Sequence, residues 1–127
     1  MEVDLQTIIF ILLFSTQNVG KSGEDFVCNK ISALGFKILQ RNFREKFGEI
    51  DIIALDGKTL CFIEVRTRNS DLLGHPSETV DLKKQHQIRR VAEFYLMKHR
   101  ISNTEIRFDV ATVVWDKYEY LYFKNAF

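Results

Sequence analysis

A turn signal near the middle of the chain constrains the fold more than any other feature. The dipeptide Asp56-Gly57 separates two runs rich in aliphatic, β-branched and aromatic residues, 49–55 and 59–66. A dipeptide of this kind between two such runs is typical of a tight β-hairpin with a two-residue loop. We therefore expect the two runs to form adjacent antiparallel strands, with Leu55 opposite Lys58.

This hairpin predicts which side chains share a face of the sheet, because side chains alternate along a strand. The expected register gives three further pairs: Asp51 with Phe62, Glu49 with Glu64, and Phe47 with Arg66. One face is then expected to carry polar groups, namely Glu49, Asp51, Glu64 and Arg66. The other face is expected to belong to the core and to carry Ile50, Ile52, Ile63 and Val65.

Three carboxylates and one guanidinium on one face have two interpretations. Opposed residues on neighbouring strands come within about 4.5–5.5 Å at Cβ, so like charges repel unless a cation lies among them. Mg²⁺ prefers carboxylate oxygens completed by water, and a divalent ion assists phosphodiester hydrolysis. Alternatively, Arg66 forms an ordinary surface ion pair with Glu49 or Glu64. The residue pattern alone leaves both interpretations open.

The rest of the chain predicts two helices and three further strands. The expected order is helix 24–34, strands 36–44, 49–55 and 59–66, helix 78–99, and strands 105–115 and 118–124. Gly35 is the expected stop of the first helix, Ser77 the N-cap of the second, and 69–76 a loop. The order α-β-β-β-α-β-β predicts a single α/β domain, with a central mixed β-sheet flanked by helices.

The length of 127 residues suits one domain, which we assign to residues 20–127. Residues 1–19 are expected to be an apolar N-terminal extension packed on it, because the apolar run 8–14 is far shorter than the roughly 20 residues of a membrane span. The net charge of +1 excludes a global field that attracts nucleic acid or membrane. Cys28 and Cys61 lack metal or redox spacing, as expected of buried thiols in a reducing cytoplasm.

Two strand motifs resemble those of a known family. The segments 48–54 (GEIDIIA) and 62–68 (FIEVRTR) are similar to the YraN-like family of uncharacterised bacterial proteins. Further similar segments are Gly23-Glu24, 34–36, 41–44, Lys84-Gln85, Arg89-Arg90 and 107–110, so the resemblance covers about 20–114. It implies the restriction-endonuclease-like fold, written PD-(D/E)XK after its motif, and a more remote similarity to archaeal Holliday-junction resolvases.

The resemblance also implies roles for individual residues. Asp51 and Glu64 would be the catalytic, metal-binding acids, with Glu49 and Glu24 as further ligands of Mg²⁺ or Mn²⁺. Arg66 occupies the position of the motif lysine. An arginine stays protonated and cannot act as a base, although it can stabilise negative charge on a phosphate.

The expected partner is DNA or RNA, because basic residues surround the acidic centre. The candidate nucleic-acid-binding residues are Arg41, Arg44, Arg68, Lys84 and Arg89. We therefore expect a nucleic-acid-binding protein that acts as a metal-dependent endonuclease. The alternatives are a non-catalytic nucleic-acid-binding module with a degenerate site, because Arg66 replaces the motif lysine, and an interaction protein whose acidic patch is merely ion-paired. Resolvase-like proteins act as symmetric dimers, so a homodimer is a further hypothesis.

Overall fold

The computed structural model describes residues 5, 19–70 and 80–127. Within these residues the elements are α2 (Val19–Ala33), β1 (Lys37–Glu45), β2 (Gly48–Asp56), β3 (Thr59–Arg68), α3 (Leu82–Lys98), β4 (Ile106–Val114), the 3₁₀ helix η1 (Trp115–Lys117) and β5 (Glu119–Phe123). The predicted order α-β-β-β-α-β-β is confirmed, with the short η1 added before the last strand.

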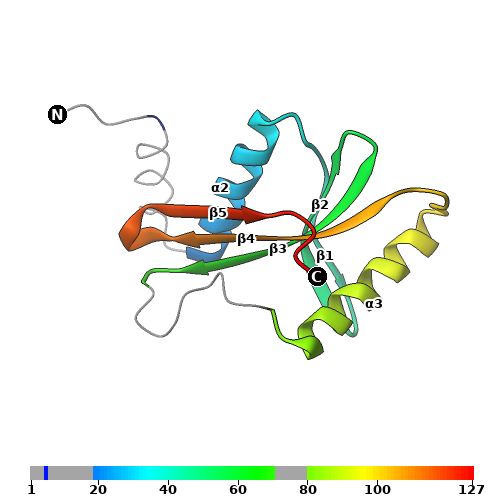
Figure 1. The fold of residues 1–127 in the computed structure, drawn as a ribbon. Helices are drawn as coiled ribbons and strands as arrows, with labels where there is room; N and C mark the ends of the chain where they lie inside the picture. The colour runs from blue at the N-terminus through cyan, green and yellow to red at the C-terminus, as the bar shows by residue number, and fades with distance from the viewer. Residues whose placement is uncertain (1–4, 6–18, 71–79) are drawn as a thin grey trace.

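The strands form one five-stranded sheet in the order β1-β2-β3-β4-β5. β3 and β4 run parallel and the other neighbours antiparallel, so the sheet is mixed as predicted. α3 belongs to the crossover between the two parallel strands, as such a pair requires. Two core clusters form: Phe26 of α2 belongs to one and Ile88 of α3 to the other, so the helices cover opposite faces of the sheet (Figure 1).

The helix ends follow local capping chemistry. α2 ends where Gly35 takes a φ of +96° and the amide of Phe36 donates back into the last turn, which confirms Gly35 as the stop. α3 begins at Leu82, later than predicted, because the carboxylate of Asp81 accepts the amide hydrogen of Lys84 at 2.8 Å and caps the helix there. α2 begins earlier than predicted.

The predicted register of the hairpin is wrong by two residues. Leu55 lies opposite Leu60, and Asp56 opposite Thr59, so Gly57 and Lys58 form the loop. Gly57 has a φ of +62°, a conformation that glycine supplies without strain at the first loop position of a type II′ turn. Because the shift is an even number of residues, it does not exchange the two faces of the sheet.

One core residue lies on the other side of the sheet from the predicted one. Ile52, Ile63 and Val65 belong to the cluster under α2, as expected, but Ile50 packs in the cluster under α3. The physical reason is a local break in strand geometry. Asn42 has a φ of +53°, and it lies between the β1–β2 pairs that contain Ile52 and Ile50. In the β1–β2 pair, the face towards which the side chains of β2 point therefore changes between Ile50 and Ile52.

Some expectations concern residues outside those described. They are the packing of the N-terminal extension, the loop at 71–76 and the Ser77 cap. Among the described residues, no helix has the length and apolar character that a membrane crossing requires.

Candidate metal centre

The centre of the site is Asp51, a carboxylate that the fold has nearly removed from solvent. Asp51 lies on β2 and is 9% exposed. The paired register of β2 and β3 ends at Ile52 and Ile63, although both strands continue. There the amide of Val65 donates to Oδ2 of Asp51 at 2.8 Å. The side chain thus satisfies a strand amide at the point where the two strands separate.

Three of the four predicted metal-binding acids come together here. Oxygens of Glu24, Glu49 and Asp51 all lie within 4.8 Å of one another. Glu24 comes from α2 and the other two from β2, so a helix on one face of the sheet completes a cluster that begins on a strand. We call these three residues the carboxylate trio.

Glu64, the fourth predicted acid, lies beside the trio and close to a lysine. Its Oε2 is 3.9 Å from Nζ of Lys84 on α3, and its side chain is 14% exposed. Burial raises the pKa of Glu64, whereas the charges of Lys84 and Arg66 lower it. Two cations, Lys84 and Arg66, therefore lie close enough to Glu64 to stabilise its charged form.

The charge of the cluster is visible at Asp51. Burial is the largest of the effects that raise the pKa of Asp51 to about 8. The nearby carboxylates act in the same direction, Glu64 most strongly, followed by Glu24 and Glu49. The hydrogen bond from Val65 acts in the opposite direction. Four acids in so small a volume resist simultaneous ionisation unless a cation neutralises them.

The donors of the carboxylate trio suit a hard divalent ion. They are all carboxylate oxygens, which Mg²⁺ and Mn²⁺ prefer, and among the described residues no histidine or cysteine joins them. Glu49 already has one cation, since Nε of Arg44 donates to its Oε2 at 2.6 Å. Among the residues that the structure describes, no cation makes such a short contact with Asp51 or Glu24, although Nη2 of Arg41 lies 3.6 Å from Glu24. The trio fits a divalent cation in both chemistry and spacing.

A pocket of about 230 Å³ opens beside Glu64. It is lined by Glu64, Arg66, Val80, Asp81 and Lys84. The structure thus places Arg66 of β3 and Lys84 of the following helix around the same acid. Sequence reasoning treated Lys84 only as a phosphate contact and had no local signal for this proximity.

The other basic candidates have varied surroundings. Arg41 donates to Asp25 at 2.7 Å, so it ties β1 to α2. Arg89 lies over the ring of Phe108 at 4.6 Å from its centroid, a cation–π contact. Arg68 is half-buried at the end of β3.

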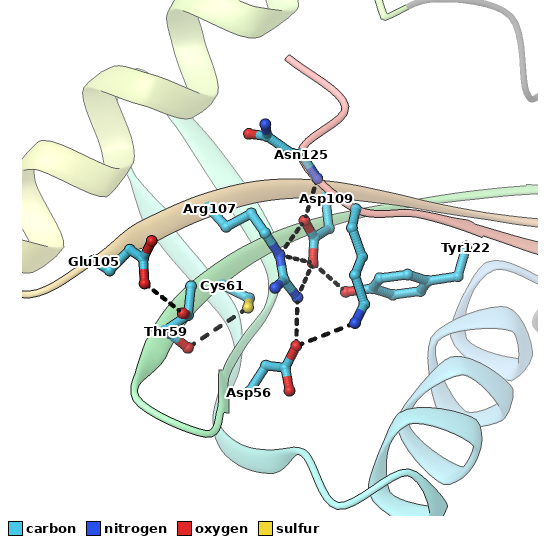
Figure 2. A network of polar contacts seen from close by, with 9 residues as sticks. Asp56, Thr59, Cys61, Glu105, Arg107, Asp109, Tyr122 and Asn125 are labelled. Carbon is cyan, nitrogen blue, oxygen red and sulfur yellow. Dashed lines mark hydrogen bonds and ion pairs between the residues drawn. The ribbon is translucent and has the colours of Figure 1, made fainter.

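A second polar cluster lies at the other end of β2, around the fully buried Asp109 (Figure 2). Arg107 donates to Asp109 from Nε and Nη2, and also to Asp56 at 3.0 Å. The hydroxyl of Tyr122 donates to Asp109 at 2.6 Å. We call Asp56, Arg107, Asp109 and Tyr122 the Asp109 network. The segment 107–110 resembles the YraN-like family, but the sequence did not predict this network, because its members lie on three strands, β2, β4 and β5.

Comparison with known proteins identifies relatives over most of the chain. The model of the uncharacterised protein family UPF0102 matches residues 23–113. A UPF0102 protein of Persephonella marina is 44% identical over 85% of this chain and 91% of its own length. One of Caldicellulosiruptor saccharolyticus is 43% identical over 87% and 98%. One of Chlorobium phaeobacteroides is 45% identical over 80% of each chain. The chain therefore belongs to the UPF0102 family, which confirms the YraN-like resemblance of its strand motifs.

Proposed function

We propose that this protein is a metal-dependent endonuclease that hydrolyses phosphodiester bonds in nucleic acid. The observation that carries the proposal is the convergence of Glu24, Glu49 and Asp51 within 4.8 Å of one another, beside Glu64. Their separation along the sequence argues against a chance run of acids, because α2 and β2 must pack together to assemble them. The mixed α/β sheet and the segments similar to PD-(D/E)XK proteins are consistent with this function.

Mg²⁺ or Mn²⁺ would be held by the carboxylate trio, with Glu64 at its edge. When bound, such an ion would activate water and neutralise charge on a phosphodiester. The chain's own contribution is to keep the acids in place. The amide of Val65 fixes Asp51, and the packing of α2 brings Glu24 to it.

Lys84 supplies a lysine that the strand motif lacks. A lysine ammonium is a compact point charge on a flexible stem, whereas the guanidinium of an arginine is planar and delocalised. With Nζ at 3.9 Å from Glu64, Lys84 can hold a water molecule or steady a phosphate beside the acids. Arg66, which lines the same pocket, would contribute a fixed positive charge to the transition state.

A second candidate is a nucleic-acid-binding module without turnover. The specific observation in its favour is Arg66 at the motif lysine's position. Under this hypothesis Lys84 only neutralises Glu64, and its removal changes binding and not a rate.

The test is cleavage of end-labelled single-stranded, duplex and branched DNA and RNA in Mn²⁺. We expect cleavage by the parent protein and a loss of at least about 100-fold in Asp51→Asn and in Lys84→Ala. Glu93→Gln, which removes an exposed acid on α3, is the matched control and should keep full activity. No cleavage of any substrate by the parent, together with cleavage by Arg66→Lys, would favour the binding module. Full activity in Asp51→Asn would rule out the proposed site.

A further inference from the structure

A groove leads away from the carboxylate trio between the β1–β2 turn and the first turns of α3. Its inner part has a volume of about 510 Å³, and its lining includes Glu49, Lys46 and Lys84. Its outer part has a volume of about 330 Å³, and its lining includes Lys83 and Arg90. Phe47 and Gln87 line both parts, so the two adjoin. We call this feature the α3 groove.

Positive charge dominates the outer part of the α3 groove. Lys83, His86 and Arg90 line it, and no acid does. The inner part has two acids in its lining, Glu45 and the trio member Glu49. Neither Lys46 nor Lys83 forms an ion pair with a residue that the structure describes. The chain therefore concentrates cations here although its net charge is only +1.

The spacing of the two cations Lys83 and Arg90, with the imidazole of His86 between them, suits an extended polyanion. Lys83, His86 and Arg90 are three and four residues apart, which places them along one side of a helix. At about 1.5 Å per residue they span about 10 Å, roughly the axial rise of three nucleotides at about 3.4 Å each. A row of this length matches a stretch of backbone phosphates better than it matches a single phosphate group.

The phenylalanine of the groove, Phe47, is already covered by other side chains. The guanidinium of Arg90 lies 4.3 Å from the ring centroid of Phe47. The ring of Phe94 meets Phe47 edge-on at 6.3 Å. The ring of Phe47 therefore offers little open face for a base to stack on, which is the usual way that bases of a single strand are held.

From these observations we infer that the α3 groove binds the sugar–phosphate backbone of a nucleic-acid strand next to the carboxylate trio, without preference for base sequence. The inference deepens the proposed function and rests on it, because the groove would deliver the strand to the trio. It adds Lys46, Lys83 and Arg90 to the residues that contact nucleic acid.

The test measures binding of fluorescent single-stranded DNA and RNA of several sequences in EDTA, as a function of salt. We expect Lys46→Ala/Lys83→Ala to reduce the slope of log affinity against log salt by about 1.4, since each lost contact with a single strand removes about 0.7. The matched control is Lys37→Ala/Lys58→Ala, which removes two exposed lysines at the opposite end of β2. The control should keep the parent slope, and the base sequence should not change affinity.

Equal slopes in the two double variants, a strong dependence on base sequence, or no binding by the parent would overturn the inference. The outcomes separate it from the proposed hydrolysis. Cleavage by the parent with an unchanged slope in Lys46→Ala/Lys83→Ala would overturn the groove alone. A reduced slope in that variant, with no cleavage by the parent in Mn²⁺, would overturn hydrolysis alone.

Discussion

Asp51 has two functions that impose opposite demands on its ionisation. As a hydrogen-bond acceptor it receives the amide of Val65 where β2 and β3 separate, which favours the charged form. As a member of an acidic cluster it is nearly buried beside three other carboxylates, which favours the neutral form. Burial and like charge prevail, since the pKa is raised to about 8. The metal-free protein therefore tends to keep a proton on the residue whose anion a cation requires.

This raised pKa makes the metal-free protein less stable as the pH rises. Between the ordinary pKa of 3.8 and about 8, folded Asp51 holds a proton that the unfolded chain has lost. The free energy of unfolding should thus fall with rising pH in that window, by up to about 1.4 kcal/mol per pH unit from this group. The loss should be complete once the pH exceeds about 8. Urea denaturation in EDTA from pH 5 to pH 9 measures it.

Asp51→Asn is the control for this prediction, because asparagine can still accept the Val65 amide but does not titrate. The variant should show a shallower fall in stability over the same window. A parent whose stability is constant or rises between pH 5 and pH 8, relative to Asp51→Asn, would contradict the raised pKa.

Among the elements, α2 determines whether the trio assembles, because it carries Glu24 to β2. Its position depends on a close approach to β3 at Gly23. A Cβ at Gly23 would overlap Oγ1 and Cγ2 of Thr67. Only glycine allows the helix to approach the strand so closely. The next residue along the helix is Glu24, the member of the trio that α2 contributes.

Gly23→Ala should therefore disturb both stability and metal binding. We expect a loss of about 1–3 kcal/mol in unfolding free energy from overpacking, less the small gain of alanine in a helix. Mn²⁺ affinity, measured by calorimetry, should fall as well, because α2 moves away from β2. Gly23→Ala/Thr67→Ala should recover part of both losses, since it removes the overlapping atoms. The exposed helix variant Ser32→Ala should change neither; additive effects in the double variant would refute the close-packing explanation.

For the whole molecule, the Asp109 network adds side-chain contacts between strands β2, β4 and β5 of the sheet. Asp56 lies at the hairpin end of β2, Arg107 and Asp109 on β4, and Tyr122 on the edge strand β5 (Figure 2). A fully buried carboxylate is stable there because its hydrogen bonds and a guanidinium compensate for its loss of water. The network lies at the opposite end of β2 from the carboxylate trio, and we infer a structural role from the hydrogen bonds that it makes within the sheet.

Asp109→Asn should destabilise the whole fold, because it leaves the largely buried Arg107 without its main partner. We expect about 3–5 kcal/mol, and about 1–3 kcal/mol for Tyr122→Phe, which removes one donor. Urea denaturation of each variant measures these losses. Asp116→Asn, at an exposed aspartate of η1, is the control and should lie within about 0.5 kcal/mol of the parent. A loss of the same small size in Asp109→Asn would show that the network contributes little.

Local chemistry in the sequence is sufficient to predict the elements of this protein. The order of helices and strands, the stop at Gly35 and the antiparallel hairpin follow from periodicity and turn residues, and the structure confirms them. Asp51 and Glu64 also follow from the sequence, because each is an acid within an otherwise apolar strand of the expected hairpin, and these two strands do pair. Family membership likewise follows from residue patterns spread along the chain.

The tertiary structure alone decided what surrounds those residues. The change of face between Ile50 and Ile52 depends on the local geometry of the sheet. The approach of Glu24 to Asp51 and the position of Lys84 beside Glu64 bring together residues that are distant in the sequence. The periodicity of side chains predicts the structure of a single helix or strand, whereas these contacts depend on how closely a helix can pack on a strand. The carboxylate trio is for this reason a property of the fold, although each of its acids is visible in the sequence.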